Sequence, residues 1–276
     1  MTDARKRFEA LALAPEAEIS LAEAGLWIAA EEYPDLDVPA WLRRLDALGH
    51  VARERVAPRL SVDRTAATLN TLLFVEHGFR GNRDDYYDPR NSFLNEVLER
   101  RLGIPITLSV VYIEVAARAG VTVRGIGLPG HFVVRMERHG VSRLLDPFNG
   151  GVTLTEADCD GLVRRVSGQE VALEPAHLAP VTTRTILTRM LGNLKGIYLA
   201  RGDWRRALQA VERILLLRPD ALSQVRDRGL IHANLGAATA AIRDWETYLQ
   251  GVPRAADADQ IRGRLRAVRQ ALAVLN

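Results

Sequence analysis

The apolar residues up to about position 76 recur every three or four residues, a spacing typical of helices that pack along one face. Ser20 precedes the first clear stretch, LAEAGLWIAA, and is placed to cap it. A break at residues 35–39 separates this stretch from a second one, WLRRLDALGHVARERV. A third runs from about Val62 to Glu76. The N-terminal part of the chain is therefore predicted to be helical.

The next segment, HGFRGNRDDYYDPRNS, is rich in Gly, Asn and Asp and predicts a loop with tight turns. We expect Asn91 or Ser92 to cap the helix FLNEVLERR that follows, and Gly103 to end it. Pro105 then opens a further helix, because proline is well tolerated in a first turn, and Gly120 closes that helix. This helix is apolar along one face, which predicts a packed position in the core.

Beyond residue 120 the pattern changes from helices to strands. The segments VTVRGIG, HFVVRM and SRLLDPF are short, rich in β-branched and apolar residues, and bounded by turn residues. They predict an antiparallel sheet. Helices followed by such a sheet indicate an α+β domain rather than alternating βα units.

From about residue 182 the chain is helical again and repeats with a period of 34 residues. The period relates small residues near helix crossings and a proline that closes each unit: Gly202 and Gly236, Ala207 and Ala241, Pro219 and Pro253. This is the tetratricopeptide period, although His232 replaces the usual aromatic residue in the second unit. The tail, DADQIRGRLRAVRQALAVL, predicts a capping helix. We place a first domain over residues 1–180 and the all-α repeats over 181–276.

Composition narrows the classes of function. No run of eighteen apolar residues predicts a membrane helix, and the acidic residues near the start argue against a secretory signal, so we expect a cytoplasmic protein. The pI is about 9.3, but the charges of both signs are interspersed, which argues against a nucleic-acid partner. The histidines lack metal-ligand spacing and no dinucleotide fingerprint is present, so we expect neither metal nor cofactor.

Two residues on the predicted strands have the chemistry of a catalytic pair. His131 follows a Pro-Gly turn, and Asp146 ends the next strand. If a two-residue turn at 138–139 joins the strands, His131 lies opposite Asp146, and a register shift of one pair keeps both on one face. A carboxylate beside an imidazole fixes its tautomer, as in the orienter and base of a triad. A pair that only ties two strands together is the alternative.

A nucleophile for this pair is missing from the expected place. A helix N-terminus stabilises a thiolate, and the available helix opens with Pro105, Ile106, Thr107, Leu108 and Ser109. Its hydroxyls, Thr107 and Ser109, need an adjacent base to react, and a first-turn capping role for Thr107 is the simpler interpretation. The single cysteine, Cys159, lies between two aspartates, which raise a thiol pKa, so we expect it to be inert.

The motifs together resemble the SirB-type transglutaminase-like family with C-terminal tetratricopeptide repeats. The resemblance rests on GNRDDYYDPRNSFLNEVLERRLGIPITLSVVYIEVAARAG, GIGLPGHFVVR and LLDPFNGG, and it covers nearly the whole chain. It implies a papain-like α+β core in which the His and Asp of the family pattern fall on His131 and Asp146. In active members a Cys begins the helix about fifteen residues before its closing Gly, and that position here is Pro105.

Two functions are therefore considered. The first is a non-catalytic interaction or regulatory module with a vestigial triad, in which the repeats and the cleft bind a protein or peptide partner. The second is a hydrolase or amide-bond transferase that uses Thr107 or Ser109 with His131 and Asp146. We expect no nucleic-acid or membrane partner for either.

Overall fold

The computed structural model describes residues 2–167 and 173–275, which form two compact units, Met1–Met190 and Leu191–Asn276. The division falls inside a helix, about ten residues after the boundary placed at 180/181. The physical reason is that the first turns of this helix pack within the first unit. Arg184 donates to the carbonyl of Ala14, and Met190 packs near Gly25.

The first unit contains most of the helices and all the named strands. Its helices are α1 (Asp3–Leu13), α2 (Leu21–Ala30), α3 (Val38–Arg55), α4 (Val62–Asn70), α5 (Leu94–Arg100), α6 (Pro105–Arg118), α7 (Glu156–Ser167) and the start of α8 (Thr183–Ala200). A π-helical segment, Thr71–Glu76, continues α4. The main sheet has the order β3 (Thr122–Ile126), β4 (Val133–Arg138), β5 (Val141–Asp146) and β6 (Val152–Leu154), with each neighbouring pair antiparallel. A two-residue parallel pair, β1 (Arg80–Gly81) and β2 (Leu102–Gly103), lies apart from it.

The predicted helix starts are mostly confirmed, but the predicted cap of α5, Asn91 or Ser92, is wrong. Ser20 accepts a hydrogen bond from the N–H of Glu23, as a cap should. Helix α5 has no side-chain cap, because the buried Asn91 side chain instead donates to the carbonyl of Asp85. The helix ends at Arg100 and not near Gly103, because the next residue, Arg101, adopts the left-handed conformation at φ 60°.

The register of the central hairpin differs from the expected one by one pair. Arg138 pairs with Val141, so the two-residue turn is His139-Gly140 rather than residues 138–139. Both turn residues have positive φ, 51° and 76°, as a type I′ turn requires. As a result, Asp146 lies at the end of the ladder, whereas His131 precedes β4 in a turn. The strand β6 was not predicted.

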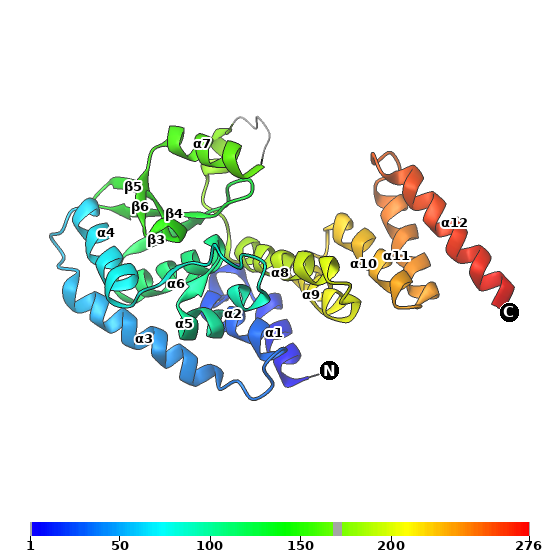
Figure 1. The fold of residues 1–276 in the computed structure, drawn as a ribbon, viewed down its shortest axis with the longest axis horizontal. Helices are drawn as coiled ribbons and strands as arrows, with labels where there is room; N and C mark the ends of the chain where they lie inside the picture. Colours follow the sequence, from blue (N-terminus) through cyan, green and yellow to red (C-terminus); the bar gives the residue numbers. More distant parts are fainter. Residues whose placement is uncertain (1, 168–172, 276) are drawn as a thin grey trace. The chain divides into compact units, whose positions relative to one another are not determined.

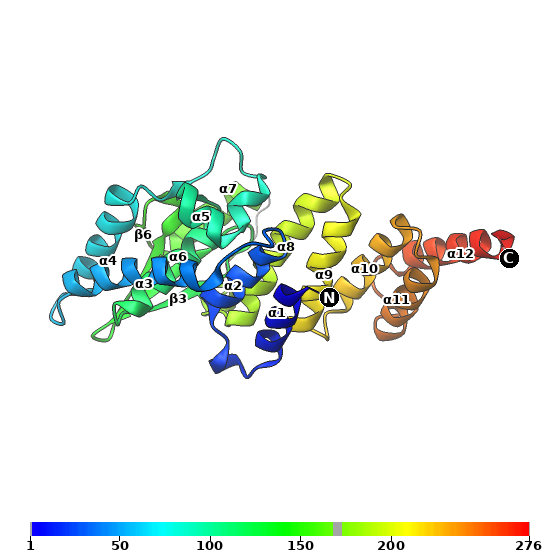
Figure 2. The same ribbon diagram turned by 90° about the horizontal axis from the view of Figure 1, so that it is seen from below.

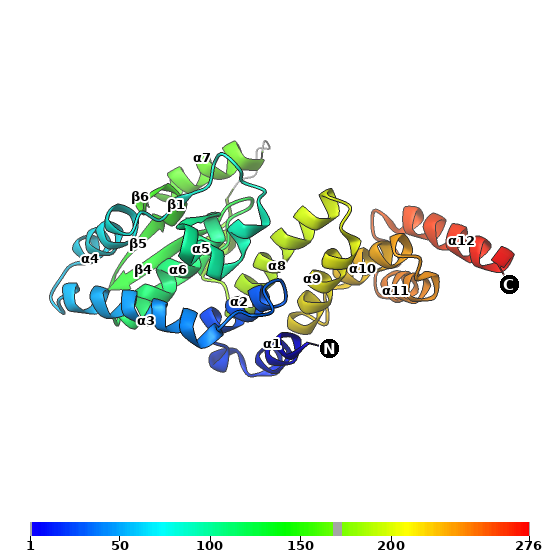
Figure 3. The same ribbon diagram turned by 60° about the horizontal axis from the view of Figure 1, so that its bottom comes forward.

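Helices cover both faces of the main sheet (Figures 1 and 3). Helix α7 packs on one face through an apolar cluster with Ile126, Val133 and Leu144. Helix α6 lies on the other face, between the sheet and the N-terminal helices, and most of its residues are buried. The first turn of α6 is thus held firmly beside the ends of the strands. The predicted α+β fold class is confirmed.

The second unit is all-α, as the 34-residue period predicts. Its elements are the end of α8, α9 (Trp204–Leu217), α10 (Leu222–Asn234), α11 (Ala238–Gly251) and α12 (Ala258–Leu275), and successive helices form hairpins (Figure 2). Gly202 and Gly236 take positive φ in the two tight turns, and Ala207 and Ala241 are fully buried where helices cross. Of the helices in the described ranges, none combines the length and apolar character that crossing a membrane requires.

Candidate functional site

His131 and Asp146 form a buried hydrogen-bonded pair. The Nε2 of His131 lies 3.0 Å from Oδ2 of Asp146, and their side chains are 6% and 0% exposed. The predicted pairing is confirmed, although the two residues meet through the turn before β4 and not through the strand ladder. Because Asp146 accepts at Nε2, the imidazole presents Nδ1 as its second nitrogen, the arrangement of an oriented base.

Asp146 is held by more than the imidazole. Its Oδ1 accepts the backbone N–H groups of Phe148 and Asn149 at 3.0 and 3.3 Å, and its Oδ2 accepts from Asn149 Nδ2 at 2.6 Å. Burial opposes ionisation, but the hydrogen bonds from His131 and Asn149, with the charge on His131, outweigh it and lower the pKa of Asp146. The carboxylate is therefore ionised at neutral pH and keeps the imidazole oriented.

The backbone around His131 is also fixed. Gly130 precedes it at φ 71°, and a Cβ there would lie 2.7 Å from Val166 Cγ1, so glycine is required for both conformation and space. Arg189 donates from Nη2 to the His131 carbonyl at 2.6 Å. Sequence reasoning did not find Arg189, because it lies 58 positions away with no local motif.

A pocket of about 410 Å³ opens beside His131, whereas Asp146 lies buried behind it and does not line the pocket. Its wall includes both His131 and Pro105, so the first residue of α6 and the imidazole face the same pocket. The other residues of the wall come from the loop before α5, the turn before β4, the segment after β5 and helix α7: Arg83, Tyr86, Gly130, Phe148, Asn149, Leu162, Arg165 and Val166. Nothing in the sequence indicates the two arginines, Arg83 and Arg165, as parts of one wall.

The hydroxyls of α6 are placed elsewhere. Thr107 is fully buried, donates from Oγ1 to the Asn91 carbonyl at 2.7 Å and accepts from the Ile104 N–H at 3.1 Å. Ser109 is fully buried, and its Oγ has no hydrogen-bond partner among the described residues. Neither residue lines the pocket that contains His131.

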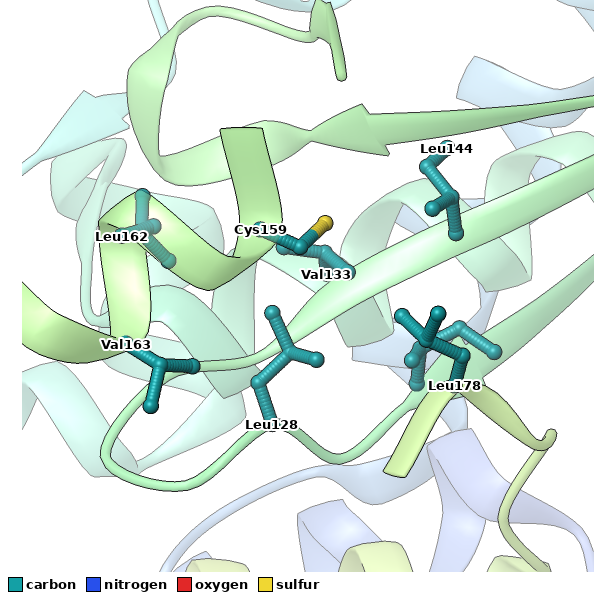
Figure 4. Packing of buried hydrophobic residues seen from close by; sticks show 8 residues of the cluster. Leu128, Val133, Leu144, Cys159, Leu162, Val163 and Leu178 are labelled. Carbon is teal, nitrogen blue, oxygen red and sulfur yellow. The ribbon is translucent and has the colours of Figure 1, made fainter. Parts of the chain in front are cut away.

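The only thiol lies in the core of the first unit. Cys159 is 0% exposed and packs with Val133, Leu144 and Leu162 in the cluster between α7 and the sheet (Figure 4). Burial, followed by the charges of Asp158, Asp146 and Glu156, raises its pKa to about 11. The predicted rise is confirmed, but its main cause is burial, and Asp160 is not among the contributing charges.

No cluster of three His, Cys, Asp or Glu side chains suited to a metal ion occurs in residues 2–167 and 173–275. The arrangement at the pocket is thus an oriented imidazole, a buried carboxylate and a helix N-terminus with proline at its first position. Among the described residues that line this pocket, none carries a thiol or an aliphatic hydroxyl.

Comparison with known proteins identifies the family of each part of the chain. The sequence profile described as the transglutaminase-like superfamily matches residues 39–192, more than half of the chain. The chain belongs to the transglutaminase-like superfamily. A second profile, described as a tetratricopeptide repeat, matches residues 194–266. A transglutaminase-like domain followed by repeats is therefore established, and such repeats commonly bind other proteins.

The similar proteins differ in sequence identity and in how much of each chain the similarity covers. A UPF0162 protein of Xylella fastidiosa is 40% identical over 94% of this chain and 93% of its own length. A UPF0162 protein of Vibrio cholerae is 31% identical over 71% of this chain and 73% of its own. F-box only protein 21 of Mus musculus is 30% identical over 61% of this chain, which is 28% of that protein. No solved structure matches.

Proposed function

We propose that the transglutaminase-like domain is a non-catalytic binding module in which the His131–Asp146 pair is a polar anchor in the wall of a ligand pocket. The observation that carries this proposal is Pro105 at the pocket wall beside His131. Proline has no thiol, hydroxyl or N–H to offer there. The tetratricopeptide repeats supply a second surface for a protein or peptide partner.

The alternative function, a hydrolase or amide-bond transferase that uses Thr107 or Ser109, is less well supported. A catalytic hydroxyl needs to lie within hydrogen-bond reach of its base, about 2.6–3.2 Å. Thr107 instead bonds to Asn91 and Ile104, and Ser109 is buried away from the pocket. The two hydrogen bonds of Thr107 suit a structural role in holding the first turn of α6.

A turnover assay of the full chain tests the proposal. We would incubate it with an N-blocked glutaminyl dipeptide plus hydroxylamine, which detects acyl transfer, and with p-nitrophenyl acetate, which detects ester hydrolysis. We expect rates no higher than those of the His131→Ala variant for both substrates. Turnover by the native chain that is lost in His131→Ala, while the circular dichroism spectrum is unchanged, would overturn the proposal.

A further inference from the structure

The pocket at His131 carries positive charge without a matching acid in its wall. Arg83 and Arg165 line it from two different segments, the loop before α5 and helix α7. No aspartate or glutamate is among the described residues of the wall. The positive end of the α6 dipole lies at the same wall, through Pro105. The pocket is therefore electrostatically suited to an anion.

The cationic side chains are not neutralised by partners nearby. Arg83 donates to Asn149 Oδ1, a neutral acceptor, and its guanidinium lies 5.2 Å from the centre of the Phe148 ring. Arg189, behind His131, donates to a carbonyl and lies over the ring of Phe132. Neither arginine has a carboxylate within 4.0 Å among the described residues. The acids Asp84 and Asp85 are exposed on the same loop as Arg83 but do not line the pocket.

The arginine of α7 differs from its neighbour on the helix. Arg164 forms a salt bridge with Asp160 and lines a different pocket. Arg165 is exposed, makes no salt bridge in the described part of the chain and lines the pocket of His131. The pKa of Asp158 is lowered mainly by its hydrogen bonds with Thr155, and the positive charge of Arg165 adds a smaller effect. Two adjacent arginines thus belong to two different surfaces.

The rest of the wall is apolar or aromatic. The Phe148 ring makes edge contacts with His131 at 6.0 Å and with Tyr86 at 6.1 Å between ring centres. Leu162 and the half-exposed Val166 complete the apolar side. Burial, with a smaller contribution from Tyr87, raises the pKa of Tyr86, so its phenol keeps a proton to donate. A bare inorganic anion would leave this apolar surface uncovered.

We infer that the pocket bounded by Arg83, His131 and Arg165 binds the carboxylate of a peptide, with the adjoining aliphatic part against Phe148 and Val166. The planar guanidinium groups match a carboxylate geometrically. A volume of about 410 Å³ falls within the range of small-ligand sites. The inference rests on the proposed function, because it treats the pocket as a place of binding and assigns the ligand class.

The test is a titration of the full chain with matched peptides. Two probes differ only at the C-terminus, acetyl-Ala-Leu-Ala as the free acid and as the amide. Two more differ only in one side chain, acetyl-Ala-Glu-Ala-amide and acetyl-Ala-Gln-Ala-amide. Binding is followed by the chemical shift of the His131 ring protons, assigned through their proximity to Phe148. Inorganic phosphate is the fifth probe.

We expect at least one of the two acidic peptides to bind at least about tenfold more tightly than its neutral match, the stronger one identifying the source of the carboxylate. Arg165→Gln should weaken that binding by roughly tenfold, because a charge-assisted hydrogen bond is lost. Arg164→Gln, the matched control on the next residue, should change it less than about twofold. Added salt should weaken binding of the acidic peptide only.

Three outcomes would overturn the inference. They are equal binding of acidic and neutral peptides, phosphate binding as tightly as the acidic peptides, and no shift of the His131 signals with any probe. Each is distinguishable from failure of the proposed function, which would appear as His131-dependent turnover in the assay above. Arg83→Gln gives a second variant, and its melting temperature reports whether the contact with Phe148 also supports the fold.

Discussion

Helices α6 and α7 pack on opposite faces of one sheet and begin with similar caps, yet their first turns have different surroundings. At α6, the Thr107 hydroxyl accepts the N–H of Ile104. At α7, the Thr155 hydroxyl accepts the N–H of Asp158, whose carboxylate accepts from the N–H of Thr155, the reciprocal arrangement of a capping box. The start of α6 reaches the open pocket at His131.

The start of α7 instead places Cys159 in the apolar cluster between the helix and the sheet. The chain therefore carries its only thiol where burial raises the thiol pKa to about 11, and a proline where a helix terminus and an imidazole would activate a thiol. We therefore expect the surroundings of a thiol, and not its presence in the chain, to decide whether it is available for chemistry. The following substitutions test it.

The largest effect is expected for Asp146→Ala. The substitution leaves His131 and the N–H groups of Phe148 and Asn149 without their buried acceptor. Breaking a buried pair of this kind costs about 3–5 kcal/mol in the free energy of unfolding. Urea denaturation of native and variant chains at pH 7 measures it. A loss below about 1 kcal/mol would mean that the pair contributes little to holding the pocket.

The dependence of stability on acid pH tests whether ionised Asp146 supplies this contribution. Because the pKa of Asp146 is lowered in the folded chain, its ionised form stabilises the fold above the ordinary carboxyl pKa. That contribution is lost as the pH falls through the lowered pKa. We therefore expect the difference in unfolding free energy between the native chain and Asp146→Ala to shrink steadily below about pH 4. A difference that stays constant down to pH 2 would contradict the assignment.

Pro105→Cys tests the two helix starts directly against each other. A thiol at a helix N-terminus beside an imidazole has a pKa of about 3.5–7.5, and the first helical position accepts non-proline residues at little cost. At pH 7 we expect iodoacetamide to alkylate the new thiol at position 105 at least about a hundredfold faster than Cys159. Mass spectrometry of peptides from one reaction compares both thiols, so Cys159 is the internal control.

The pH dependence of the two alkylation rates distinguishes the ionisation of each thiol from its accessibility to the reagent. The new thiol should reach its full rate near pH 8, whereas the thiolate fraction of Cys159 keeps rising toward its pKa of about 11. Cys159 should react rapidly at pH 7 only after unfolding in urea, because burial also blocks the reagent. Similar native rates for the two thiols would contradict the contrast between the helix starts.

Thr107→Val should reduce stability by about 1–3 kcal/mol, because it leaves the buried carbonyl of Asn91 and N–H of Ile104 without their partner. Valine keeps the shape of threonine, so the loss reports the hydrogen bonds. Thermal and urea unfolding measure it. If stability is unchanged but a His131-dependent turnover disappears, Thr107 is a nucleophile and the structural interpretation is wrong.

The sequence predicts the parts of this site that rest on local patterns. Helix α6 and strands β3–β5 follow from periodicity, Pro105 and turn residues. The His131–Asp146 contact follows from their places near two consecutive strands. The hairpin register does not follow, because it depends on His139 adopting a left-handed conformation that a non-glycine residue rarely takes. The end of α5 at Arg100 does not follow from the sequence for the same reason, because the next residue, Arg101, is also left-handed.

The walls of the pocket depend on contacts between distant segments. Arg83 and Arg165 are 82 positions apart, and each looks like an ordinary solvated arginine in its own neighbourhood. Asn149 is easier to relate to the site from the sequence, since it follows Asp146 in DPFNGG and a short polar side chain there can return to the carboxylate. Tertiary packing, which has no local signature, brings these residues together.

The smallest effect is expected for Ser109→Ala. The Ser109 hydroxyl is fully buried in α6 and has no partner in the described residues, so its removal deletes an unsatisfied polar group and one atom of packing. These two contributions oppose each other, and alanine also favours the helix, so unfolding free energy should change by less than about 1 kcal/mol. Peptide-carboxylate binding at the pocket should be unchanged, because Ser109 does not line it. A destabilisation above about 2 kcal/mol would reveal a hydrogen bond made by this hydroxyl, and loss of a His131-dependent turnover would show that it reaches the imidazole after all.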